Sequence, residues 1–250
     1  MRHARLGKSF VFLFLACAGF AAAQVTIGSV MNAGSRVASG QFYGIAQGSL
    51  FAINGKGVGP DQFQQATFPL PTTDGLGGVT VQASVGGATV DCIMVYVAPN
   101  EVGAIMPSNT PLGTGTVTVN NNGVTASKPI TVVAAAFGVF TQNYGFGSGL
   151  AVAFNVASDG STTPNSLTQS VQTGQDVLIN GTGLGAITSD ETQSGVTDVP
   201  ATTIQVYVGA VKSPALEVRK LGANDRGAIG LWAGNNSDGD FSNLRVTPMK

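Results

Sequence analysis

The chain has 250 residues with a formal net charge of −1; only 10% of the residues are charged and 35 are glycine. An average soluble domain has about 25% charged residues and about 7% glycine, so this composition excludes a coiled coil and charge-driven disorder. The basic residues are scattered, which argues against a nucleic-acid partner. The single histidine is His3, so the rest of the chain lacks an imidazole for a catalytic triad or a histidine-ligated metal.

Residues 1–23 have the pattern of a secretory signal peptide. Three basic residues precede an apolar run at 10–20, and alanines at 21–23 supply the small side chains that signal peptidase requires. We therefore expect cleavage before Gln24 and a secreted protein. The apolar run is too short to span a bilayer, which takes about 20 apolar residues, and we expect no membrane span elsewhere.

The chain has two cysteines, Cys17 and Cys92. Cys17 lies inside the apolar run, and its lipidation is an alternative to simple secretion that the sequence leaves open. Cys92 then has no partner for an internal disulfide. Its neighbours alternate along a predicted strand, which places Cys92, Met94 and Tyr96 on one face, and we expect Cys92 to be a small buried apolar residue.

Residues 24–46 are predicted to be an N-terminal leader, in which 25–31 is a candidate for an added edge strand. From Gly48 onward, short runs rich in Val, Ile, Thr and Phe alternate with Gly, Asn or Pro. This spacing is typical of an all-β sandwich, and no helical periodicity follows the signal segment.

One strand and glycine-turn unit occurs twice. Residues 48–60 (GSLFAINGKGVGP) align without gaps on 174–186 (GQDVLINGTGLGA), and 79–87 (VTVQASVGG) align on 202–210 (TTIQVYVGA). A fixed order of matching segments indicates two copies of one structural unit.

The glycines of this unit, Gly55, Gly57 and Gly59, allow two interpretations. Glycines after a strand can bring the backbone close to a dinucleotide, but that site needs a helix directly after the turn. Here Pro60 and a Gln-rich loop follow. We therefore expect the glycines to serve a strand corner with positive φ, and no cofactor.

Residues 46–212 resemble the paired TIG/IPT module found in secreted acidobacterial proteins. The motifs that carry the resemblance stand in order: LFAINGKGVGP, LGGVTV, VYVAPNEVGAIMP, GTGTVTVNNNG, AAFGVFT, DGSTTPN and INGTGLG. The resemblance implies two tandem immunoglobulin-like β-sandwiches, at 47–133 and 173–250, joined by a Gly- and Phe-rich connector at 134–172. It implies an extracellular location and no catalytic residues.

The tail, residues 213–250, departs from this pattern. Its segments GAIGLW and GDFSNLRV resemble the last strands of a concanavalin-like, laminin-G-type jelly roll. We expect the tail to complete the second sandwich, because an open sheet edge exposes unpaired backbone groups. A gene fusion or a truncation is the alternative.

Neither a metal site nor a catalytic pair of carboxylates is predicted. Residues 235–240 (NNSDGD) could offer oxygens to Ca²⁺, but the calcium-loop spacing is missing and Asp-Gly favours a hairpin turn. The other carboxylates considered for sugar hydrolysis occur singly or as neighbours that point apart on an extended segment. They are Glu101, Asp190, Glu191, Glu217 and Asp225.

Aromatic residues are the candidate ligand contacts. Phe137, Phe140, Tyr144 and Phe146 cluster in the connector, and Trp232 lies in the tail. Such rings can stack on sugars, but packing between sandwiches explains them too, and we favour packing.

The sequence therefore predicts a secreted, non-enzymatic immunoglobulin-like module for extracellular adhesion, scaffolding or presentation, with a protein or a cell-surface polysaccharide as partner. The alternative is a carbohydrate-binding module or a remnant of a polysaccharide-active protein.

Overall fold

The computed structural model describes residues 24–40, 43–143, 149–172, 176–194, 201–206 and 216–221, the last two ranges by their backbone alone. All regular secondary structure in these ranges is β-strand, so the expected all-β class is confirmed. The expected signal peptide 1–23, Tyr144, Phe146, and the part of the tail that holds 235–240 and Trp232 lie outside the described residues.

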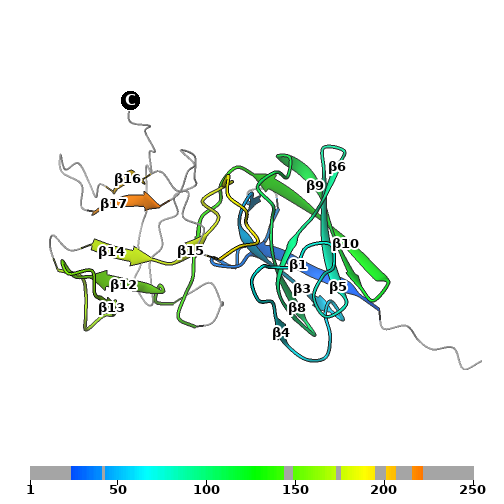
Figure 1. Cartoon of the computed structure of the whole chain (residues 1–250), viewed down its shortest axis with the longest axis horizontal. Coiled ribbons are helices and arrows are strands. Elements are labelled where there is room, and N and C mark those ends of the chain that lie inside the picture. The colour runs from blue at the N-terminus through cyan, green and yellow to red at the C-terminus, as the bar shows by residue number, and fades with distance from the viewer. Residues whose placement is uncertain are drawn as a thin grey trace, which may run out of the picture.

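Two five-stranded sheets form the larger part of the fold, called here the first sandwich (Figure 1). In spatial order, the first sheet contains β1 (Thr26–Asn32), β3 (Leu50–Lys56), β8 (Glu101–Ile105), β7 (Ile93–Ala98) and β4 (Gln64–Gln65). The second sheet contains β2 (Ile45–Ala46), β10 (Val124–Val133), β9 (Gly113–Asn121), β5 (Val79–Val85) and β6 (Ala88–Asp91).

The core lies between these two sheets. Along β5 the apolar side chains at 79, 81, 83 and 85 are at most 2% exposed, whereas the polar ones between them point outward. Phe51 and Ile53 of the facing sheet are fully buried in the same cluster. Because each fully buried Val, Ile or Phe contributes about 1.5–3 kcal/mol, this alternation fixes which face of each strand points inward.

A β-bulge in β7 changes the expected arrangement of its side chains. Cys92 and Met94 are fully buried in the core, as expected for Cys92. The pairing with β8 shifts register between Met94 and Tyr96, so that Met94 faces Ala104 and Tyr96 faces Gly103. The prediction that Tyr96 shares a face with Cys92 and Met94 is therefore wrong, because the extra residue turns Tyr96 to the outer face of the sheet.

Residues 24–46 supply two strands to the first sandwich. The expected edge strand at 25–31 is present as β1, which pairs antiparallel with β3 from Thr26 opposite Lys56 to Asn32 opposite Phe51. A bulge interrupts this pairing at Gly28. The short β2 pairs in parallel with the end of β10.

The remaining strands, called here the second strand group, lie at one end of the first sandwich (Figure 1). They are β11 (Gly138–Val139), β12 (Ala153–Val156), β13 (Thr162–Pro164), β14 (Asp176–Ile179), β15 (Gly181–Thr182), β16 (Ala201–Val206) and β17 (Leu216–Leu221). β12 lies between β13 and β14, β11 pairs with β15, and β16 pairs with β17.

The second strand group repeats the start of the first sandwich. The gapless alignment of Gly48 on Gly174 places β3 on residues 176–182, which form β14 and β15. Their upstream partners β12 and β11 take the place of β1, so that Gly138 faces Thr182 as Thr26 faces Lys56. The chain leaves this pairing after Phe140 and returns to it at Val152. This interruption lies at the position that corresponds to the bulge of β1 in the first copy.

The strand β17 comes from the predicted tail. It pairs antiparallel with β16, from Ala201 opposite Leu221 to Val206 opposite Leu216. β16 lies in the second copy of the segment that forms β5, and β5 pairs with the next strand along the chain in the same antiparallel way. The tail thus provides the pairing partner for the second copy.

Candidate functional site

The repeated glycines lie where the backbone is crowded or turns sharply. A Cβ atom added at Gly55 would overlap the carbonyl oxygen of Thr26, and one at Gly59 would overlap that of Ala98. Gly57 has a φ of 62° and its counterpart Gly183 a φ of 96°, which L side chains rarely adopt. Both copies therefore use these glycines to bring strands together and to turn the chain.

The predicted ligand-contact aromatics do not form a described platform. Phe137 is half-buried, and its ring packs against Gly181, where an added Cβ would overlap it. Phe140 is also half-buried, and its backbone N–H donates to the carbonyl of Asn180. For Phe137 the geometry supports the packing interpretation, while Tyr144 and Trp232 lie outside the described residues.

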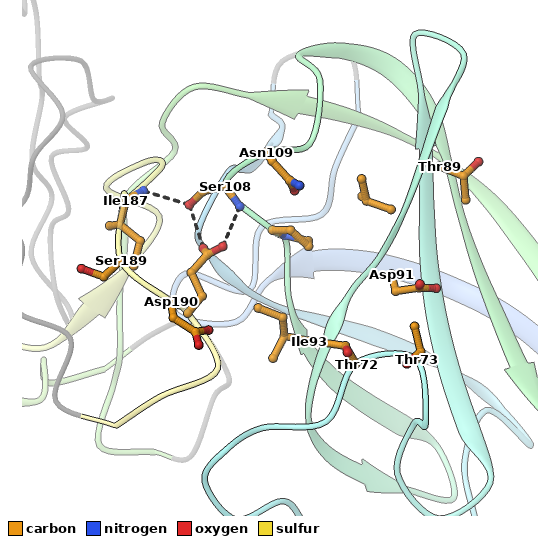
Figure 2. Close-up of a pocket in the computed structure, with 13 residues that line it drawn as sticks. Thr72, Thr73, Thr89, Asp91, Ile93, Ser108, Asn109, Ile187, Ser189 and Asp190 are labelled. Carbon is orange, nitrogen blue, oxygen red and sulfur yellow. Dashed lines mark hydrogen bonds between the residues drawn. The ribbon is translucent and has the colours of Figure 1, made fainter.

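Glu191 joins the second strand group to the first sandwich. Its two carboxylate oxygens accept hydrogen bonds from the backbone N–H of Ser108 at 2.8 Å and from the Ser108 hydroxyl at 2.7 Å. The Ser108 Oγ in turn accepts the backbone N–H of Ile187 at 2.8 Å (Figure 2). We call Ser108, Ile187 and Glu191 the junction clamp. A carboxylate that receives two donors makes stronger bonds than a neutral acceptor does.

A second line of hydrogen bonds crosses the same junction. The side-chain amide of Asn32, which is 3% exposed, donates to the carbonyl of Ala136 at 2.9 Å, while its Oδ1 accepts the backbone N–H of Gly34 at 2.8 Å. The hydroxyl of Thr182 accepts the backbone N–H of Leu50 at 2.8 Å. The backbone N–H of Leu70 also donates to the carbonyl of Thr192 at 2.8 Å, so several separate hydrogen bonds hold the two parts of the chain together.

An open groove of about 670 Å³ lies beside the junction clamp. Hydroxyl side chains, one amide and several apolar side chains line it together with Asp91, Asp190 and Glu191 (Figure 2). These carboxylates already have partners: Asp91 accepts the side-chain amide of Gln82, and Asp190 accepts the backbone N–H of Thr192. In the part of the chain that is described, no three His, Cys, Asp or Glu side chains are grouped to hold a metal ion.

A second cluster covers the outer face of the first sheet. The guanidinium of Arg36 contacts both oxygens of Glu101, and the hydroxyl of Tyr96 donates to Glu101 Oε1 at 2.5 Å. The ring of Phe63 lies beside that of Tyr96, with centroids 6.1 Å apart and a tilt of 32°. Gly103 lies under the Tyr96 ring, because an added Cβ there would overlap it.

These contacts set the protonation of Glu101 and Tyr96. Burial alone would raise the pKa of Glu101, but the hydrogen bonds from Arg36 and Tyr96 and the charge of Arg36 outweigh it and hold this pKa below the ordinary value. Burial, together with the neighbouring Glu101 carboxylate, raises the pKa of Tyr96. At neutral pH the cluster therefore contains a carboxylate, a guanidinium and a neutral phenol.

The lowered pKa of Glu101 predicts a pH-dependent contribution to stability. Because its pKa is lower in the folded state, the contribution is complete above the unfolded value, about 4.3, and is lost as the pH falls through the folded value. We expect Glu101→Gln to cost about 1 kcal/mol at pH 7, since the pair is partly exposed, and almost nothing at pH 2. Urea unfolding of both proteins at the two pH values measures this, and an equal difference at both would contradict it.

Comparison with family models, with curated proteins and with solved structures finds no match to this chain. Among the described residues, no helix is long and apolar enough to cross a membrane.

Some of the side chains in these sites carry no local sequence signal. Ser108 and Glu191 are 83 positions apart, and Arg36 and Glu101 are 65 apart. The sequence presents Glu101 and Glu191 as single carboxylates, and only the fold supplies their partners. Phe63 stands in a Gln-rich loop whose pairing with β7 has no periodic pattern, because β4 has only two residues.

Proposed function

We propose that this chain is a secreted, non-enzymatic, immunoglobulin-like module of the TIG/IPT type that serves extracellular adhesion, scaffolding or partner presentation. In this role it holds two β units in a fixed relative orientation and offers its outer surfaces to a protein or to a cell-surface polysaccharide. The observation that carries the proposal is the junction, where Glu191 and Thr182 of the second strand group accept hydrogen bonds from the first sandwich.

The outer face of the second sheet supports this role. Its side chains are short hydroxyls and amides that pair across strands: the hydroxyls of Thr118 and Ser127 lie 2.7 Å apart, and those of Ser84 and Thr89 lie 2.8 Å apart. Cross-strand pairs of this kind stabilise a sheet and leave its face polar but almost uncharged. Such a face stays hydrated and suits a spacer.

The carboxylates also support a role without catalysis. Hydrolysis of a glycosidic bond requires two carboxyl groups that face each other across the substrate. Glu101 and Glu191 instead accept bonds from Tyr96 and Ser108 in separate clusters. Each of these carboxylates has a structural partner that its removal would leave unsatisfied.

The role of the junction is tested by removing hydrogen bonds that cross it. In the mature chain 24–250, the double substitution Thr182→Val, Glu191→Ala removes the two side-chain acceptors and leaves the bonds to the backbone carbonyls of Ala136 and Thr192. We expect small-angle X-ray scattering to show a broader range of molecular dimensions. The loss of hydrogen bonds to a partly exposed carboxylate is expected to lower the stability of the junction by about 1.5 kcal/mol.

The matched control is Asp190→Ala. Asp190 is adjacent to Glu191, but among the described residues its side chain accepts hydrogen bonds from Thr192 and Gln193 of its own loop. This variant should scatter like the unaltered chain. If the double variant also keeps the dimensions of the unaltered chain, the side chains of Glu191 and Thr182 do not set the orientation, and the observation that carries the spacer role is refuted.

A further inference from the structure

We propose that Phe63 and Tyr96, called here the aromatic pair, form with Gln65 a binding site for one pyranose ring of a neutral polysaccharide. The site lies on the outer face of the first sheet. It specifies a neutral polysaccharide among the partners of the proposed function, and its test does not depend on the junction.

The exposed ring of Phe63 is the main contact surface. Its side chain is 62% exposed, although an aromatic ring of this size gains by burial. Gln65 faces Tyr96 across the pairing of β4 and β7. Because side chains alternate along an extended segment, Phe63 and Gln65 lie on the same face, which is the face of Tyr96. The aromatic pair and one amide therefore point to the same side.

The support beneath this surface is rigid. The hydroxyl of Tyr96 is fixed by Glu101, whose two oxygens are fixed by Arg36. On its inner side the Tyr96 ring lies against Gly103, where no side chain separates it from the strand. Because Tyr96 is held in place before binding, the surface beside the Phe63 ring loses little conformational entropy when a ligand stacks on Phe63.

The chemistry of the site matches a sugar. A pyranose has an apolar C–H face, which stacks on an aromatic ring, and a rim of hydroxyls, which bond to planar amides such as that of the exposed Gln65. Arg36 and Glu101 neutralise each other. The charged residue nearest to Phe63 in the sequence is the exposed Asp61, whose negative charge would repel an acidic polysaccharide.

The size of the site argues against a protein partner. A stable protein interface buries about 800 Å² on each side, with apolar anchors at its centre. The aromatic pair offers one exposed ring with one neighbouring amide, which suits a single sugar ring. Since a single exposed aromatic residue is common on protein surfaces, the test compares Phe63 with a second exposed ring.

Phe68 provides that comparison. It lies in the same loop and is 56% exposed, and among the described residues its ring has no ring contact of the kind that Phe63 makes with Tyr96. Phe63→Ala and Phe68→Ala thus remove rings of similar exposure, of which the first packs against a partner ring and the second does not. Protection of Cys92 from a thiol reagent reports that the first sandwich remains folded in both variants, because Cys92 is buried in its core.

The experiment is affinity electrophoresis of the mature chain through gels that contain barley β-glucan, xyloglucan, galactomannan, dextran or polygalacturonate, with pull-down on cellulose and chitin. We expect at least one neutral polysaccharide to retard the chain, Phe63→Ala to weaken this binding at least tenfold, Gln65→Ala to weaken it about threefold, and Phe68→Ala to leave it unchanged.

Three results would overturn the proposal. The first is no binding to any neutral polysaccharide of the set, and the second is equal loss in Phe63→Ala and Phe68→Ala. The third is retention only by polygalacturonate, which would assign the surface to an acidic polymer.

Discussion

Deletion of residues 213–250 is expected to unfold the second strand group at 25 °C and to leave the first sandwich folded. The deletion removes β17, which is the partner of β16 in the described part of the chain. A strand without a partner cannot satisfy its backbone groups, and even a two-stranded ribbon is only marginally stable in water.

The second strand group is already less covered than its counterpart. Ile53 of β3 is fully buried, whereas Ile179, at the matching position of β14, is 39% exposed. β3 pairs with β8 on the side opposite β1, while in the described ranges β14 pairs with β12 alone. With less apolar burial to lose, this group has little reserve against the loss of a strand.

Calorimetry of the chain 24–212 against the chain 24–250 measures the effect. We expect two unfolding transitions in the longer chain and one in the shorter, with Cys92 equally protected from a thiol reagent in both. The control is truncation after Leu221, which keeps β17 and should keep the second transition. An unchanged melting profile in the chain 24–212 would show that the tail is not part of the second strand group.

Alternation along the chain is the feature that sequence analysis used best. The run from Val79 to Val85 has one apolar residue at every second position, and the sheet buries those residues. The expected burial of Cys92 also follows from this pattern. Alternation failed at Tyr96, because a bulge between Met94 and Tyr96 shifts the register. The bulge could not be predicted, since it does not change the apolar character of the local sequence.

The repeat predicted more of the fold than periodicity alone. Aligning Gly48 on Gly174 identified in advance the residues of β14 and β15, which have the same span as β3. It did not identify β11 and β12 as the upstream partners of these strands. The segment between them, 140–152, interrupts the pairing at the place where β1 has only a bulge, so the two copies have no common spacing there.

The candidate sites depend on contacts between distant parts of the chain. Asn32 donates to Ala136 across 104 positions, and Ser108 donates to Glu191 across 83. No periodic pattern links such residues, because their pairing is decided by how the sheets and the junction are assembled. The aromatic residues of the connector were the visible candidates for this reason, although Phe63, in a loop without a motif, has a more exposed ring than Phe137 or Phe140.

The repeated glycine turn gives the second large effect, an expected loss of about 3 kcal/mol in the stability of the first sandwich on Gly55→Ala. An added methyl group at Gly55 would overlap the carbonyl oxygen of Thr26 and approach Val58 Cγ1 to 2.6 Å. Relief requires β1 to move away from β3, and β1 carries Val30, which is 2% exposed. The substitution therefore loosens both a strand pairing and part of the core.

Two further substitutions separate crowding from backbone conformation. Gly57→Ala meets its nearest atom at 3.3 Å but must adopt a φ of 62°, so we expect a cost of about 1 kcal/mol. Gly40→Ala meets no atom within 4 Å, and we expect a change within about 0.5 kcal/mol. Urea unfolding followed by the exposure of Cys92 measures all three. If the glycines serve packing and turning, the cost in stability should fall in the order Gly55, Gly57, Gly40. Equal costs would contradict this role. A rise in the melting temperature of the unaltered chain on addition of a dinucleotide would instead favour a phosphate-binding turn.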